Sequence, residues 1–216
     1  MKRELLFTIT AIGILLLVSP LNARAQSTDV PKYEVAAEFS SLTLNISHTE
    51  PGLGGRFTYN LNKHVAFEAA GYFFPHECQF CSTGRISEGL FGVKAGKRFE
   101  KWGIFAKARP GLMSFSKGSF TLVPIGGGGP FPFTIESRRL TNFALDVGGV
   151  LEFYPSRRIV TRFDFGDTMV RFGQRTTGFQ LITDPTTGVT TLGPPIISPA
   201  YTAHTFQFTA GVGFRF

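Results

Sequence analysis

The last thirteen residues of the chain, HTFQFTAGVGFRF, constrain its fold most strongly. Phenylalanine, alanine and valine alternate from Phe206 to Phe216 with threonine, glutamine, glycine and arginine. Successive side chains of an extended strand point to opposite faces, so one face here is apolar and the other is polar or small. One face suits lipid and the other suits water. The segment therefore predicts a membrane-spanning β-strand.

The opposite end of the chain predicts an export signal. Two basic residues precede an apolar run from Leu5 to Val18, and Ala23-Arg24-Ala25 then offers small residues at an A-x-A cleavage site. The apolar run is shorter than the ~20 residues that a spanning helix needs. We expect residues 1–25 to be a cleaved signal peptide and residues 26–216 to be the mature domain. An uncleaved membrane anchor is the alternative.

The composition describes a moderately basic, aromatic chain. It has 22 basic and 15 acidic side chains, and removing three basic residues and one acidic residue with the signal leaves 19 against 14, a net charge of +5. The basic residues are scattered singly, which argues against nucleic acid as a partner. Anionic lipopolysaccharide or anionic solutes fit better. The 24 phenylalanines and 25 glycines favour tightly turned β structure over helices.

Alternation of apolar and polar residues predicts eight strands. They are Tyr33 to Leu44, Leu53 to Leu61, Val65 to Phe74, Ile86 to Phe99, Gly103 to Phe115, Arg139 to Tyr154, Ile159 to Phe172 and His204 to Phe216. Short connections alternate along the chain with long ones. This is the arrangement of an even-stranded barrel with short periplasmic turns and long extracellular loops.

Closure of the sheet is expected because the strands are surrounded by lipid. Lipid cannot hydrogen-bond a free strand edge, so the last strand must pair with the first. Arg139 to Tyr154 exceeds the ~9 to 11 residues that cross a bilayer, so we expect such strands to continue beyond it into the loops. The predicted fold is all-β, an eight-stranded antiparallel up-and-down transmembrane barrel. A soluble lipocalin-like barrel fits less well, because its outer face would not be banded with phenylalanine.

The segment GLGGRFTYNLNKHVAFEAAGYFF, Gly52 to Phe74, resembles two adjacent strands of the small outer-membrane β-barrel proteins, the OmpA-like and opacity-protein barrels. The resemblance extends over residues 26–216 and implies an outer-membrane location in a Gram-negative-type bacterium. It also implies contact with membrane lipid and lipopolysaccharide, and insertion by the barrel assembly machinery through the last strand. The residues expected to carry that insertion signal are Phe206, Phe208, Val212, Phe214 and Phe216. With no segment after the last strand, a peptidoglycan tether is not implied.

Strand alternation also assigns a polar lumen. The charged residues expected to point inward are Arg56, Glu68, Glu88, Lys94, Lys107, Arg109, Asp146, Glu152, Arg162 and Asp164. An eight-stranded barrel is just wide enough for side chains to fill, so the first hypothesis is a paired, filled interior. The alternative is a narrow porin-like channel with a weak anion preference, set by Arg56, Lys94, Lys107, Arg109 and Arg162.

Three places break the simple pattern. Ser40-Ser41 and Gly166-Asp167 shift the apolar alternation by one residue, which predicts a bulge or the membrane rim. Pro110 lacks a backbone donor and predicts a bend or an unpaired position in its strand.

Cys78 and Cys81 form a C-x-x-C in a long loop. In an exported protein a local disulfide is the leading interpretation. A zinc site, completed by His76 and Glu77, is a weaker alternative, and a thioredoxin-like motif would need a βαβ setting.

No catalytic motif stands out. The four histidines, at 48, 64, 76 and 204, have no serine partner at a recognisable spacing, although some small outer-membrane barrels are enzymes acting on lipid A. We therefore expect no enzyme activity and no cofactor. The expected role is structural or surface binding, with a possible extracellular ligand at the long loops.

Overall fold

The computed structural model describes residues 30–45, 48–75, 84–124 and 133–216. The expected signal peptide, residues 1–25, and the cysteine pair, Cys78 and Cys81, lie outside these ranges. Within them, no helix is long and apolar enough to cross a membrane.

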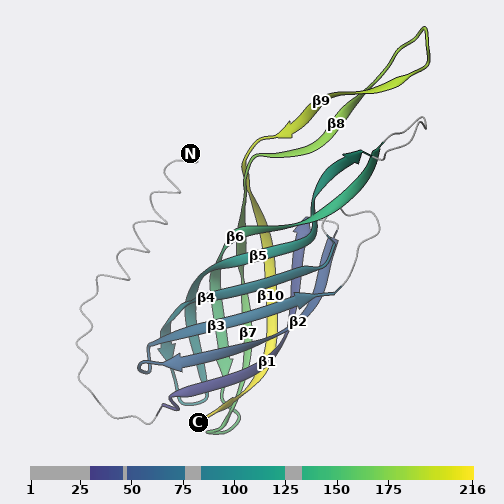
Figure 1. Cartoon of the computed structure of the whole chain (residues 1–216). Coiled ribbons are helices and arrows are strands. Elements are labelled where there is room, and N and C mark those ends of the chain that lie inside the picture. Colours follow the sequence, from purple (N-terminus) through teal and green to yellow (C-terminus); the bar gives the residue numbers. More distant parts are fainter. Residues whose placement is uncertain (1–29, 46–47, 76–83, 125–132) are drawn as a thin grey trace, which may run out of the picture.

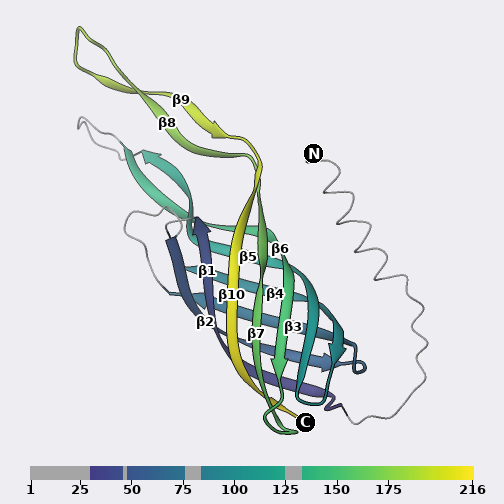
Figure 2. The same cartoon turned by 180° about the vertical axis from the view of Figure 1, so that it is seen from behind.

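The described residues form ten strands, eight of which close into an antiparallel barrel (Figures 1 and 2). The strands are β1 Tyr33–Asn45, β2 His48–Asn60, β3 Val65–Phe74, β4 Ile86–Arg98, β5 Trp102–Pro124, β6 Phe133–Phe153, β7 Ile159–Phe172, β8 Arg175–Thr183, β9 Thr190–Ser198 and β10 Tyr201–Arg215. The order around the barrel is β1-β10-β7-β6-β5-β4-β3-β2. The first strand pairs with the last from Glu34 opposite Arg215 to Thr43 opposite Phe206, as the sequence predicted.

The barrel strands agree closely with the predicted ones, and β3 agrees residue for residue. The main differences lie where long loops were expected. β2 begins at His48 instead of Leu53, β5 continues to Pro124, and β6 begins at Phe133. The expected loop from Gly173 to Ala203 contains a separate two-stranded sheet, β8–β9. The long loops are thus largely extended hairpins, because pairing satisfies backbone groups beyond the membrane as well as within it.

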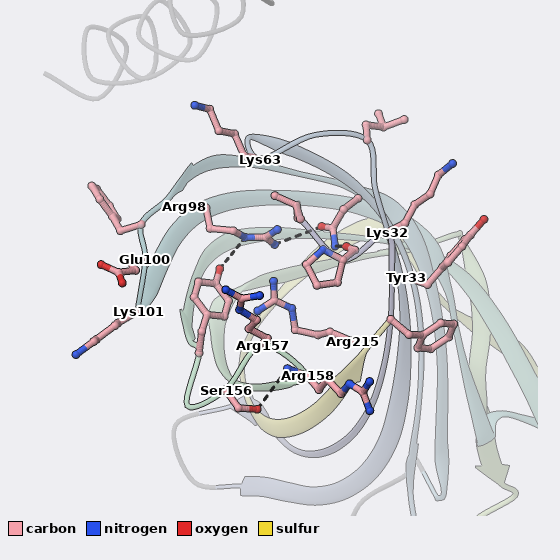
Figure 3. Close-up of a pocket in the computed structure, with 17 residues that line it drawn as sticks. Lys32, Tyr33, Lys63, Arg98, Glu100, Lys101, Ser156, Arg157, Arg158 and Arg215 are labelled. Atoms are coloured by element: carbon pink, nitrogen blue, oxygen red, sulfur yellow. Dashed lines mark hydrogen bonds between the residues drawn. The ribbon is translucent and has the colours of Figure 1, made fainter. Parts of the chain in front are cut away.

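Three short turns join the barrel strands at one end. Asn62 forms the first by accepting hydrogen bonds at Oδ1 from the backbone N–H of His64 (2.7 Å) and Val65 (2.9 Å). Ser156 holds the third turn by accepting from Ile159 N (3.1 Å). These turns surround an opening that we call the short-turn mouth (Figure 3).

The opposite end carries the long hairpins. Figure 1 shows β8–β9 projecting well beyond the barrel, beside the extension of β5 and β6. The β5–β6 register shifts between Phe115 and Ser119, so the pair bends there. At the tip of β8–β9, Asp184 accepts hydrogen bonds from the backbone N–H groups of Thr186 and Thr187, which lower the pKa of its carboxyl group.

The outer face of the barrel is apolar. Its exposed side chains include Val35, Phe39, Leu53, Phe57, Phe67, Phe73, Phe91, Ile104, Leu112, Phe143, Phe153, Phe165, Phe206, Phe208, Val212, Phe214 and Phe216. Near the short-turn mouth, Tyr33 stacks against Phe57 with ring centroids 6.1 Å apart, and Trp102 stacks on Phe99 at 4.2 Å. Such an outward band with aromatic residues at its border is the surface that a bilayer surrounds.

The two predicted bulges are absent from the barrel. β1 keeps one register against β10 through Ser40 and Ser41, and β7 does so through Gly166 and Asp167. The bulge, one of the two predicted alternatives, was wrong because it assumed that inward positions stay polar. Leu42 on β1 and Val170 on β7 are inward, buried and apolar, which imitates a change of face in the sequence.

Pro110 causes no bulge either. The pairing of β4 with β5 continues in the same register on both sides of it, from Leu90 opposite Gly111 to Val93 opposite Ala108, with two pairings missing between. The missing donor therefore interrupts the ladder with β4 locally without bending the strand out of register.

Candidate functional site in the lumen

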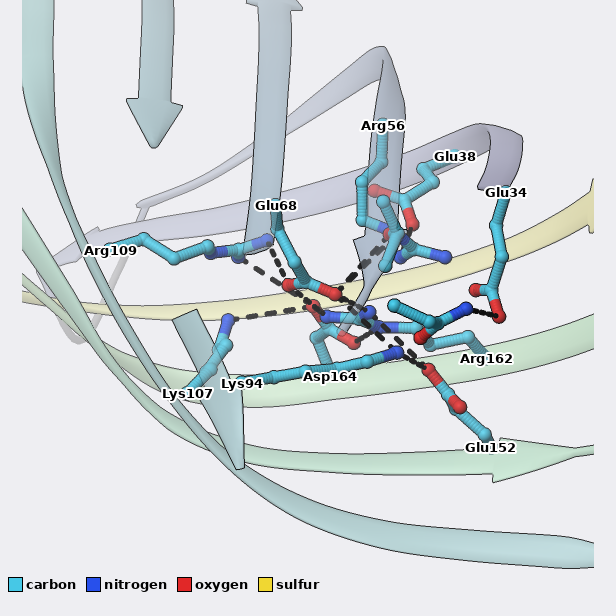
Figure 4. Close-up of polar contacts among 12 residues, drawn as sticks. Glu34, Glu38, Arg56, Glu68, Lys94, Lys107, Arg109, Glu152, Arg162 and Asp164 are labelled. Carbon is cyan, nitrogen blue, oxygen red and sulfur yellow. Dashed lines mark hydrogen bonds and ion pairs between the residues drawn. The ribbon is translucent and has the colours of Figure 1, made fainter. Parts of the chain in front are cut away.

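All ten charged residues proposed for the lumen point into it and are buried, each with 5% exposure or less. They come from six of the eight barrel strands, β2 to β7. Figure 4 shows eight of them converging inside the barrel. Period-two alternation places them there, because every second residue of a barrel strand faces the interior.

Glu68 on β3 and Arg162 on β7 form the centre of this network. The Arg162 guanidinium donates to both oxygens of Glu68, at 2.9 Å for the Nη2–Oε2 contact, and also to both oxygens of Asp164. Lys94 Nζ approaches Glu68 Oε1 at 3.5 Å. A planar guanidinium that binds two carboxylates bidentately fixes its neighbours geometrically as well as electrostatically.

A second group of pairs lies on the β5 and β6 side. Arg109 donates from Nε to Asp146 Oδ2 at 2.8 Å, and Lys107 Nζ lies 2.8 Å from the same oxygen. Both cations also approach Asp164, at 3.6 Å and 3.7 Å. One carboxylate thus neutralises two neighbouring cations, and Asp164 joins this group to Arg162.

Glu38 on β1 forms a third group that sequence reasoning missed. Arg56 donates to its Oε1, and Tyr72 donates from its hydroxyl to Oε2 at 2.6 Å. Glu38 could have been found, because it alternates with the outward Val35, Ala37 and Phe39.

Towards the short-turn mouth, Glu152 pairs with Lys94 and with Arg98, the latter at 3.4 Å. Glu34 on β1, also missed from the sequence, lies 3.5 Å from Arg98 and 3.4 Å from Arg215. These pairs form the lowest charged layer of the lumen.

Glu88 lies apart from the cations. It accepts a hydrogen bond from Gln207 Nε2 at 2.9 Å, and the same amide group donates to Ser40 Oγ at 3.0 Å. Gln207 Oε1 accepts in turn from the Thr168 hydroxyl at 2.7 Å. This hydrogen-bonded layer separates the ion pairs from the hairpin end.

The half of the lumen beyond this layer is mostly apolar, although Glu50, opposite Leu42, and Asn142, opposite Met113, are also buried there. Its buried apolar members are Leu42, Ala70, Tyr72, Phe74, Ile86, Leu90, Met113, Phe115, Ala144, Val170 and Phe172. Phe115 and Phe172 contact each other with ring centroids 5.5 Å apart. We call this set the apolar plug. Sequence reasoning missed it, because an apolar residue facing the lumen has the same signature as one facing lipid.

The paired charges of the lumen nearly balance. Among the described residues, ion pairs within 4.0 Å join seven cations to six carboxylates; the cations are Arg56, Lys94, Arg98, Lys107, Arg109, Arg162 and Arg215, and the carboxylates are Glu34, Glu38, Glu68, Asp146, Glu152 and Asp164. All five residues considered as anion-selectivity candidates are among the paired cations. Paired charges of this kind suit a filled interior better than a row of free cations.

His204 is the one candidate histidine with a carboxylate partner among the described residues. Its Nδ1 lies 2.6 Å from Asp167 Oδ2 on the outer face of the barrel, near the hairpin end. The strand pairings place Met169 and Phe206 beside these two residues, not a serine or cysteine. No cluster of metal-ligating side chains occurs in the part of the chain that the structure describes.

Searches against protein families and curated proteins find no match. Solved structures with a similar fold include Neisserial surface protein A (13% identity, 86% of this chain and 97% of that chain, TM-score 0.49) and the N-terminal β-barrel domain of Pseudomonas aeruginosa OprF (11%, 85% and 97%, TM-score 0.43). A third is Ail of Yersinia pestis in complex with the heparin analogue sucrose octasulfate (12%, 85% and 96%, TM-score 0.43). The closed barrel and its apolar outer band decide the fold class. The fold is a closed, eight-stranded, antiparallel up-and-down β-barrel.

Proposed function

We propose that this protein is a membrane-embedded scaffold that holds its long hairpins outside the outer membrane for binding, without catalysis or cofactor. The observation that carries the proposal is the content of the lumen, where a paired charge network and the apolar plug occupy successive layers. A barrel filled in this way gains rigidity from its interior, and its variable surface is left for recognition.

The β8–β9 hairpin is the part best suited to bind a partner. It forms a sheet of two strands only, so each strand has one edge whose backbone groups lack a strand partner. Exposed apolar side chains lie along it, among them Ile182, Val189, Ile196 and Ile197. Open edges and apolar side chains together favour a partner that adds a strand or an apolar surface, over one recognised by charge.

Arg175 anchors this hairpin to the barrel rim. It donates from Nη1 to the Gly118 carbonyl at 3.1 Å, and its guanidinium lies over the Phe172 ring at 4.9 Å from the centroid. A hairpin held at its base presents its edges in a limited range of orientations, which reduces the entropic cost of binding.

The remaining proposed partners follow from the expected location of the protein in the outer membrane. Membrane lipid and lipopolysaccharide would surround the apolar band, and the barrel assembly machinery would recognise the last strand through its outward phenylalanines. Nucleic acid has no part in it.

The binding role can be tested with a peptide-display library selected against the folded protein in nanodiscs. A variant in which residues 176–197 are replaced by a short glycine-serine turn serves for counter-selection and retains Arg175. We expect selected peptides to be apolar and strand-forming and to lose binding to the variant. Peptides that bind both proteins equally would contradict a role for this hairpin.

A further inference from the structure

The short-turn mouth is a cavity of about 1630 Å³. Its lining comes from the start of β1, the three short turns and the end of β10 (Figure 3). Its floor is formed by Arg98 and Arg215 of the lowest charged layer of the lumen, and it is separate from the hairpins to which binding was assigned above.

The lining of the mouth is strongly basic. Seven of the seventeen lining side chains are lysine or arginine, and one, Glu100, is acidic. The lumen directly above has nearly equal numbers of both signs, so this imbalance is local. A concave surface of one sign concentrates ions of the opposite sign.

Two of the arginines are fixed in place at the floor of the cavity. The Arg98 guanidinium donates from Nε to the Tyr154 hydroxyl at 2.9 Å, and Arg215 lies over the Tyr154 ring at 4.5 Å from its centroid. Their side chains are only 7% and 6% exposed. Even so, Arg98 Nη1 has no hydrogen-bond partner among the described residues, whereas Arg215 Nε faces Glu34 Oε1 at 3.4 Å. Buried donors of a charged group that stay unused are costly, unless a ligand accepts from them.

A third arginine completes the group. Arg157, in the turn between β6 and β7, has no ion pair among the described residues, and Figure 3 shows its guanidinium directed toward those of Arg98 and Arg215. Glu34 and Glu152 offset part of the charge of Arg98 and Arg215, and Arg157 adds a third guanidinium that no carboxylate among the described residues balances. The arrangement becomes favourable when an anion lies between them.

We propose that the short-turn mouth is a binding site for a phosphate-bearing ligand, held by Arg98, Arg157 and Arg215. Guanidinium groups match phosphate oxygens bidentately, and a multiply charged phosphate neutralises three cations better than one carboxylate does. The outer lysines, such as Lys32, Lys63 and Lys101, extend the site for a ligand with more than one phosphate. The ligand is a soluble phosphate compound or the headgroup of an anionic phospholipid at the periplasmic leaflet.

Equilibrium dialysis of radiolabelled pyrophosphate against the membrane-extracted protein in neutral detergent tests the proposal. We expect one equivalent to bind per chain, with affinity that falls as salt rises. Arg157→Gln, at an exposed turn position where folding is not at risk, should weaken binding on the order of tenfold through the lost charge-assisted hydrogen bonds.

Arg138→Gln is the matched control. Arg138 is exposed on β6 at the hairpin end, so it makes the same change of net charge far from the mouth. It should leave pyrophosphate binding unchanged. Equal weakening by both substitutions, or no saturable binding to the unmodified protein, would overturn the proposal.

The two sources of phosphate are separated by repeating the dialysis in nanodiscs. If the natural ligand is a lipid headgroup, nanodiscs of phosphatidylglycerol should suppress pyrophosphate binding relative to phosphatidylcholine, and Arg157→Gln should remove that difference. Equal binding in both lipids identifies a soluble phosphate compound.

Discussion

At the scale of single residues, Glu68 is the most connected charge in the lumen. It lies within 4.0 Å of four cations, Arg56, Lys94, Arg109 and Arg162. Burial of so many charges is tolerable only because each is paired. The loss of one partner therefore matters more than the loss of an exposed charge.

Glu68→Gln should lower the free energy of unfolding by about 3–5 kcal/mol, because it leaves buried cations uncompensated. The control is Glu100→Gln in an exposed short turn, which should change it by no more than about 0.5 kcal/mol. Urea unfolding followed by the fluorescence of Trp102, the single tryptophan, measures both. Equal stability of the two variants would show that the network does not stabilise the barrel.

Inward residues could be predicted from the sequence when they were charged, and could not when they were apolar. The ten charged candidates were identified because a charge between two outward apolar residues has only one place to point. Phe74 and Met113 could not be identified in this way, although both are fully buried inside. Their inward direction follows from counting along the strand from a known residue, and the sequence does not mark where the interior changes from polar to apolar.

At the scale of elements, strand directions were predictable and strand ends were not. Turn residues such as Asn62 and Ser156 marked the short connections, because their side chains hydrogen-bond the backbone locally. The extensions of β5 and β6 were assigned to a loop because the run Gly126 to Gly129, between Pro124 and Pro130, predicts irregular structure.

The β6–β7 pair is held together closely by two inward glycines. Gly148 lies opposite Gly166, and a Cβ added to Gly148 would lie 2.1 Å from the Phe165 carbonyl oxygen and 2.5 Å from Gly166 Cα. Gly148→Ala should therefore force these strands apart and reduce the yield of folded barrel in a heat-modifiability gel. Gly89→Ala, where a Cβ would meet nothing within 4 Å, should fold normally. Normal folding of both variants would contradict close approach of the strands.

The β8–β9 hairpin forms its own sheet and should contribute little to the barrel. Replacing residues 176–197 with a short turn should leave the free energy of barrel unfolding, measured in urea, within about 0.5 kcal/mol of that of the unmodified protein. A larger loss would mean that the hairpin and the barrel unfold as one unit.

At the scale of the whole molecule, closure was the most secure prediction. It follows from the absence of hydrogen-bonding groups in lipid, and the pairing of β1 with β10 confirms it. The basic short-turn mouth was not predicted, because its charges come from sequence positions as distant as Lys32, Arg98 and Arg215. Cations that are scattered singly in the sequence form a cluster because the fold brings the three short turns together with the start of β1 and the end of β10.

The central claim is that the lumen is closed by paired charges and by the apolar plug. Planar-bilayer conductance of the folded protein, with folding shown by heat-modifiable gel mobility, tests it most directly. We predict no discrete conductance steps above the bare bilayer. Stable, anion-selective steps that diminish on Arg56→Gln or Lys107→Gln would contradict the claim and establish a narrow channel instead.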